Sequence, residues 1–187
     1  MLFIEIVCQT IELSFIFQHN KVRIFFGNIS LKIVREESFM PQATHTVTVN
    51  AAPNAAWDFL KEYENWAPLI PGYIAHEVQS DKQFTWIFLA DLGFTKKTIK
   101  LAVTVVDLVE PTDVKFDLKG ISDNFNGNGY FKIVGDSEAE VTGSLDLAAG
   151  GMMGMMINSV LESFVPKATK EFTESIQTKI SELHGVK

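Results

Sequence analysis

The run of six alternating segments between residues 74 and 148 constrains the fold more than any other feature of the sequence. Apolar and polar residues alternate in 74–80, 83–91, 97–109, 113–120, 125–135 and 139–148. A period of two is typical of strands that bury one face. The connections are short and polar, as in Ser80-Asp81-Lys82, and this spacing predicts an antiparallel meander of hairpins.

One strand and a helical region precede this run. Residues 43–49 alternate as a strand, and residues 50–66 have the spacing of a helix in which Pro53 suits the first turn. The segment 67–73, Ala-Pro-Leu-Ile-Pro-Gly-Tyr, interrupts that pattern and leaves room for at most one short second helix.

A long amphipathic pattern from 151 to 183 closes the chain, and Pro166 is expected to kink this helix because proline removes one backbone hydrogen bond. The order of elements predicts an α+β protein with a helix-grip fold. In it, a curved antiparallel sheet of about seven strands wraps around the long C-terminal helix, and one or two short helices follow the first strand.

Residues 1–39 differ in composition from the rest of the chain. They contain no Ala, Asp, Pro, Trp or Tyr but are rich in Ile and Phe. One interpretation is an added β-meander with strands in 11–17 and 22–34 and a turn at Gly27-Asn28. The other is an upstream stretch that was read by mistake, with the native protein starting at Met40. The sequence therefore predicts an N-terminal extension, 1–39, and a domain, 40–187.

Overall totals exclude several functional classes. The formal net charge of −7 argues against a nucleic-acid partner, since phosphate binding needs a basic surface. A single cysteine, Cys8, fits a reducing compartment and, with four scattered histidines, makes a zinc site improbable. No apolar run is long enough to span a membrane. We therefore expect a cytoplasmic protein without a metal or cofactor.

The segment 49–73 carries a family resemblance. Pro53, Trp57, Phe59, Leu60 and the later pair Pro71-Gly72 form the pattern P-x-x-x-W-x-F/L followed by PG. With the topology of residues 43–183, this resembles the carbon monoxide dehydrogenase G-subunit branch of the START-like, or SRPBCC, superfamily. Members of that branch are associated with maturation or membrane recruitment of a molybdenum hydroxylase, which implies a possible protein partner. The sequence stops at Lys187 without an apolar anchor, so stable membrane contact is not expected.

One face of the predicted strands is almost wholly apolar, and we expect it to be the concave face. The other face, which includes Ser144 and Asp146, is expected to meet solvent. Gly127, Gly129 and Gly143 fall in phase with the apolar residues, where they either bend the sheet or leave room for a ligand. The predicted ligand-binding residues are Phe84, Trp86, Phe88, Leu101, Val103, Phe116, Phe125, Gly127, Gly129, Phe131, Met152, Met153, Met156, Ile157 and Leu161.

Four methionines crowd the start of the last helix, at 152, 153, 155 and 156, interleaved with glycines. Met side chains adapt to ligands of varying shape, and glycine weakens a helix by about 1 kcal/mol relative to alanine. These residues suit a deformable lip of a cavity. Ordinary core packing explains them equally well, and contact with a membrane surface is the least favoured alternative.

The sequence leaves two functions in competition. An apolar cavity without a catalytic set favours a non-enzymatic binder or carrier of a small hydrophobic molecule. The alternative is an enzyme of the polyketide cyclase or dehydratase type, with His76 or Tyr73 as the proton-transferring group. A lone histidine in a strand is more often structural, and Asp91 is a weaker candidate still.

Overall fold

The computed structural model describes all residues except 1–14, 19–20, 27–28, 34–41, 92–94 and 185–187. The chain divides into two compact units, Met1–Phe39 and Met40–Lys187. In the first unit, strands β1 (Phe15–Gln18), β2 (Lys21–Phe26) and β3 (Ile29–Ile33) form an antiparallel sheet in the order β1-β2-β3. The predicted turn at Gly27-Asn28 lies outside the described residues.

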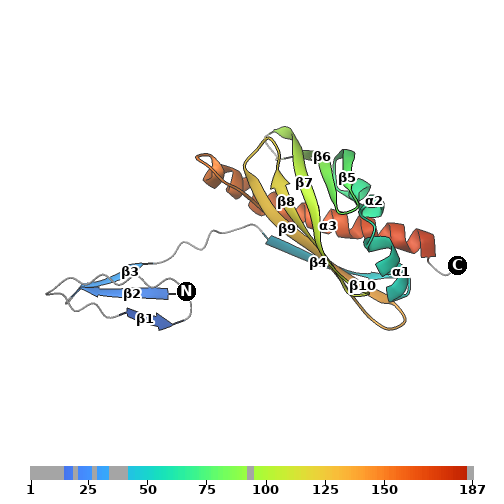
Figure 1. Cartoon of the computed structure of the whole chain (residues 1–187), viewed down its shortest axis with the longest axis horizontal. Helices are drawn as coiled ribbons and strands as arrows, with labels where there is room; N and C mark the ends of the chain where they lie inside the picture. The colour runs from blue at the N-terminus through green and yellow to red at the C-terminus, as the bar shows by residue number, and fades with distance from the viewer. Residues whose placement is uncertain (1–14, 19–20, 27–28, 34–41, 92–94, 185–187) are drawn as a thin grey trace. The chain divides into compact units, whose positions relative to one another are not determined.

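The second unit contains a seven-stranded antiparallel sheet and confirms the predicted helix-grip fold (Figure 1). The sheet order β4-β10-β9-β8-β7-β6-β5 follows from hairpins between successive strands, with the first strand added beside the last. The strands are β4 (Gln42–Val49), β5 (Tyr73–Ser80), β6 (Gln83–Asp91), β7 (Lys96–Val109), β8 (Asp113–Gly120), β9 (Phe125–Val134) and β10 (Ala139–Ala149).

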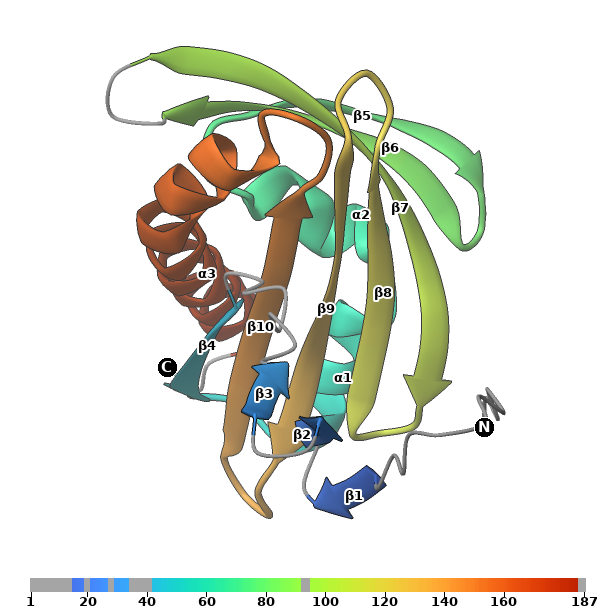
Figure 2. The ribbon, with the colours of Figure 1, turned by 90° about the vertical axis from the view of Figure 1, so that its left-hand side faces the viewer.

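The long helix α3 (Gly154–His184) lies inside the curve of the sheet, where it packs against β4 and β10 (Figure 2). It runs without interruption through Pro166, and the kink expected there stays a prediction. Gly151 has a φ of 78°, a left-handed conformation that suits glycine, so the helix starts after this turn rather than at residue 151.

The predicted helix over 50–66 is divided into α1 (Pro53–Leu60) and α2 (Tyr63–Trp66), and a 3₁₀ turn, η1 (Ala67–Leu69), follows. The division exposes carbonyl groups at the end of α1, which need partners. The Asn65 side chain donates to the Phe59 carbonyl at 3.0 Å, and Trp66 Nε1 donates to the Leu60 carbonyl at 2.9 Å. The break therefore places the Trp66 indole over the sheet without leaving these carbonyls unpaired.

Trp66 fills the centre of the concave face. It is fully buried, and the centroids of five aromatic rings lie 5.2 to 6.3 Å from its own. Four of these rings come from the sheet and one from α3, so the short helix α2 joins the two layers of the core. The five rings belong to Phe84, Trp86, Phe116, Phe131 and Phe172.

The apolar face is buried as predicted, but two residues of the opposite face are not exposed. Ser144 is 3% exposed and Asp146 is 9% exposed. Both belong to β10, an internal strand, where Ser144 stands in register with Thr44 on one side and Tyr130 on the other. Short side chains between neighbours on both sides lose solvent contact, which the alternation pattern cannot show.

Candidate functional site

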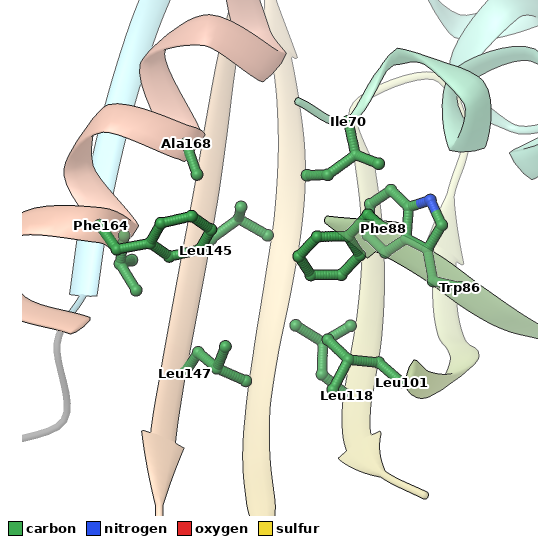
Figure 3. Close-up of a pocket in the computed structure, with 10 residues that line it drawn as sticks. Ile70, Trp86, Phe88, Leu101, Leu118, Leu145, Leu147, Phe164 and Ala168 are labelled. Carbon is green, nitrogen blue, oxygen red and sulfur yellow. The ribbon is translucent and has the colours of Figure 1, made fainter. Parts of the chain in front are cut away.

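A small apolar pocket lies between α3 and the sheet strands that α3 does not cover (Figure 3). Its volume is about 30 Å³, and the described residues that line it are all apolar. Since one water needs at least about 10–15 Å³, this inner pocket holds little more than a methyl or ethyl group as it stands. Its lining residues are Ile70, Trp86, Phe88, Leu101, Leu118, Leu145, Leu147, Phe164, Val165 and Ala168.

A wider outer groove of about 270 Å³ lies beside the inner pocket. Phe164 and Ala168 line both spaces, so α3 forms a shared wall and the Phe164 side chain lies between them. The groove is amphipathic, with charged groups that the inner pocket lacks. Its lining residues are Pro71, Gly72, Leu89, Asp91, Lys96, Phe164, Lys167, Ala168 and Glu171.

Three of the predicted ligand-binding residues, Trp86, Phe88 and Leu101, line the inner pocket. Trp86 arrives there with its polar atom satisfied, because Nε1 donates to the Ala67 carbonyl at 2.6 Å. The other apolar residues predicted on the strands are buried in the core outside the pocket, and three of them surround Trp66. These residues are Phe84, Val103, Phe116, Phe125 and Phe131.

The predicted glycine vacancies are filled. A Cβ atom on Gly129 would lie 2.4 Å from Cζ of Phe116, and one on Gly143 would lie 2.3 Å from Oγ1 of Thr173. At Gly127 a Cβ would lie 2.0 Å from the Asp146 carbonyl oxygen of the neighbouring strand. The glycines therefore allow close approach of a ring, of α3 and of backbone, and they leave no room for a ligand.

The methionines at the start of α3 are exposed, with relative accessibilities of 102% for Met152, 57% for Met153, 88% for Met155 and 55% for Met156. Ordinary core packing is therefore the wrong explanation for them. They line neither the inner pocket nor the outer groove among the described residues. Of the predicted residues that follow, Ile157 is half-buried and Leu161 is buried.

Tyr73 and His76, the predicted proton-transferring candidates, form a hydrogen-bonded pair. Tyr73 Oη and His76 Nδ1 are 3.0 Å apart, because a register shift in β5 between Tyr73 and Ala75 turns both side chains to the same side. The His76 ring also meets Phe84 edge-on, with centroids 6.0 Å apart. Neither residue lines the inner pocket or the outer groove, whereas Asp91 lines the groove.

Sequence reasoning missed much of the pocket lining. Leu118, Leu145 and Leu147 were visible on the apolar face, and Phe164 and Ala168 were visible on the helix stripe. What no pattern indicated was the seam where these two surfaces meet. Ile70 comes from the irregular segment after η1, which carries no periodicity at all.

Within the described part of the chain, no three His, Cys, Asp or Glu side chains gather closely enough to hold a metal ion. Nor does any helix among the described residues have the length and apolar character needed to cross a membrane.

Solved structures with this architecture include several enzymes and one protein named only by its superfamily. The Zhui aromatase/cyclase from Streptomyces sp. R1128 matches with a TM-score of 0.60 at 15% identity, over 79% of this chain and 99% of that chain. A norcoclaurine synthase point mutant from Thalictrum flavum matches with a TM-score of 0.58 at 13% identity, over 80% and 99%. A START superfamily protein from Mycobacterium smegmatis matches with a TM-score of 0.52 at 17% identity, over 76% and 98%.

These identities establish the shared fold. No curated protein sequence matches the chain. The sequence profile of the G subunit of carbon monoxide dehydrogenase (CoxG) matches residues 46–181, which is most of the second unit and includes the segment that carries the predicted resemblance. The chain therefore belongs to the CoxG family, within the START-like superfamily of helix-grip proteins.

Proposed function

We propose that this protein binds and carries a small hydrophobic or lipid-like molecule without changing it chemically. The observation that carries the proposal is the inner pocket, whose described lining is wholly apolar and which adjoins an amphipathic groove. General acid–base chemistry needs a titratable group near the substrate, and none of the lining residues of the inner pocket supplies one.

The present volume requires that the site widen to admit a ligand, since pockets for drug-sized molecules occupy roughly 300–1,000 Å³. Two features support widening. Phe164 is half-buried between the two spaces, so a change of its rotamer joins them. Pro166, two residues along α3, has no N–H for the helical hydrogen bond and so weakens this turn.

The family suggests a biological setting for this carrier. A cytoplasmic accessory of a molybdenum hydroxylase, as the resemblance to the carbon monoxide dehydrogenase G-subunit branch implies, would bring its ligand to the partner enzyme. The exposed methionines at the start of α3 offer adaptable apolar contacts for such a ligand or partner.

Solvent extraction of the purified protein followed by mass spectrometry tests the proposal directly. We expect a co-purified apolar molecule, or, in the empty protein, saturable binding of the neutral dye N-phenyl-1-naphthylamine. A protein that yields no extract and does not bind the dye is not a carrier of this kind.

A variant with leucine at 152, 153, 155 and 156 examines the methionines separately. Because these side chains are exposed, the fold should survive, and we expect dye uptake to change because leucine is less adaptable than methionine. Unchanged uptake would remove the methionines from ligand entry.

The Tyr73–His76 hydrogen bond favours the second candidate, an enzyme of the polyketide cyclase type. A tyrosine held by a histidine is a reasonable proton-transferring pair. The variants His76→Ala and Tyr73→Phe decide this point: loss of turnover of an aromatic polyketide-like substrate in both, with dye binding intact, would establish the enzyme. No turnover by the unmodified protein would leave the carrier as the function.

A further inference from the structure

The outer groove differs from the inner pocket in one respect that bears on the ligand, namely its two lysines. Lys96 comes from β7 and Lys167 from α3, so they belong to different walls of the same groove. Their side chains are 66% and 72% exposed. The groove thus presents two ammonium groups at the entrance to a space lined by apolar side chains.

Each lysine has only a loose ion pair with an acid on its own wall. Lys96 Nζ lies 3.9 Å from Asp91 Oδ2, and Lys167 Nζ lies 4.0 Å from Glu171 Oε1. Exposed pairs at such distances contribute little stability. The ammonium groups can therefore leave these partners for an anion that offers shorter, charge-assisted hydrogen bonds.

The acids of the groove are less suited to hold a cation in the same way. Asp91 is short and makes further interactions of its own, and Glu171 is less exposed than either lysine. The two lysines carry their charges on longer side chains, which reach further into the groove. An anion between the walls would draw both ammonium groups toward it.

We infer that the ligand is an amphipathic anion, whose compact carboxylate-like head lies in the outer groove between Lys96 and Lys167. Its apolar tail passes Phe164 and ends in the inner pocket among Trp86, Phe88 and Leu101. This inference rests on the proposed carrier function and adds to it the class of ligand.

The test displaces N-phenyl-1-naphthylamine from the full chain with three molecules that share one tail: decanoate, decan-1-ol and decyltrimethylammonium. We expect decanoate to compete best at low salt and to lose this advantage as salt screens the lysines. Equal competition by all three, or strongest competition by the cation, overturns the anionic head while the carrier function stands. A protein that binds neither the dye nor any of the three loses the carrier function and this inference together.

Three variants locate the head. The double substitution Lys96→Gln with Lys167→Gln should weaken decanoate about fivefold and leave decan-1-ol unchanged. Glu171→Gln should strengthen decanoate, because it removes a negative charge from the groove and frees Lys167. Lys170→Gln is the matched control, since Lys170 lies on the same helix, pairs with Glu174 and does not line the groove. A double variant that binds decanoate as well as the unmodified protein places the head elsewhere and overturns the inference.

Discussion

At the scale of single residues, the closest approach of α3 to the sheet depends on one missing methyl group. Gly143 faces Thr173, whose hydroxyl already donates to the Thr169 carbonyl one turn earlier at 2.7 Å. An added Cβ at 143 would lie 2.3 Å from Thr173 Oγ1 but 3.4 Å from its Cβ and Cγ2. The clash is therefore confined to the hydroxyl oxygen.

The substitution Gly143→Ala should lower the free energy of unfolding by about 1–3 kcal/mol, as overpacking of a core does. Adding Thr173→Ala removes the clashing oxygen and should recover part of this loss. Urea denaturation of the two single variants and the double variant measures the coupling. Additive losses would contradict the contact, because residues that touch show an interaction energy.

Asp146 is the second residue whose environment makes a prediction. Its Oδ1 has no hydrogen-bond partner among the residues that the structure describes, and burial raises the pKa of this carboxyl above its ordinary value. The folded state then holds the proton more tightly than the unfolded chain. Stability from this group is present below the unfolded pKa and is lost as pH rises through the raised, folded pKa.

The variant Asp146→Asn should therefore be more stable than the unmodified protein at pH 7, because it buries no charge. The difference should shrink as the pH is lowered past the raised pKa, where the aspartic acid is neutral as well. Thermal unfolding across this pH range measures it. A variant that is less stable at pH 7 would show that the carboxylate has a stabilising role.

At the scale of elements, the start of α3 is fastened to the end of β10 by one side chain. Asn158 Oδ1 accepts from the Ala149 N–H at 2.7 Å, and Asn158 Nδ2 donates to the Ala149 carbonyl at 3.1 Å. Both backbone groups of the last strand residue are thereby satisfied. The methionine-bearing turn is exposed, yet it is anchored at this point.

Replacing Asn158 with alanine should cost about 1–3 kcal/mol, because two partly buried backbone groups lose their partners. Amide exchange at the start of α3 should rise more than exchange in its second half. Ser159→Ala is the control, since the Ser159 hydroxyl bonds only to the exposed Met156 carbonyl one turn earlier. Equal effects of the two substitutions would contradict the anchoring role.

The elements themselves could be predicted from the sequence, because period-two alternation and helical stripes reflect burial directly. Phe116 and Phe131 were assigned correctly to the inward face in this way. The pocket could not be predicted, since which inward residue lines a space depends on which other side chain fills the rest. Trp66, for example, shows no special spacing, yet its packing takes Phe84 and Phe116 out of reach of a ligand.

At the scale of the whole molecule, the two units have separate cores, and the question raised by Met40 becomes experimental. A protein starting at Met40 should fold and unfold with a thermal midpoint within a few degrees of the full chain, because residues 40–187 form one compact unit. Circular dichroism and calorimetry of both forms measure this. Aggregation of the shorter form would show that residues 1–39 are required. N-terminal sequencing of the native protein then tells which form exists.

The indole of Trp66, tied to Leu60 by its N–H, is in effect a tethered guest of its own host. Removing it with Trp66→Gly would leave an aromatic-walled void, and apolar voids of this kind stay dry and accept small aromatic molecules. Free indole added to such a variant should restore part of the lost stability. A single codon therefore separates a filled sheet from a receptor for planar molecules, and relatives could widen their specificity by that short route.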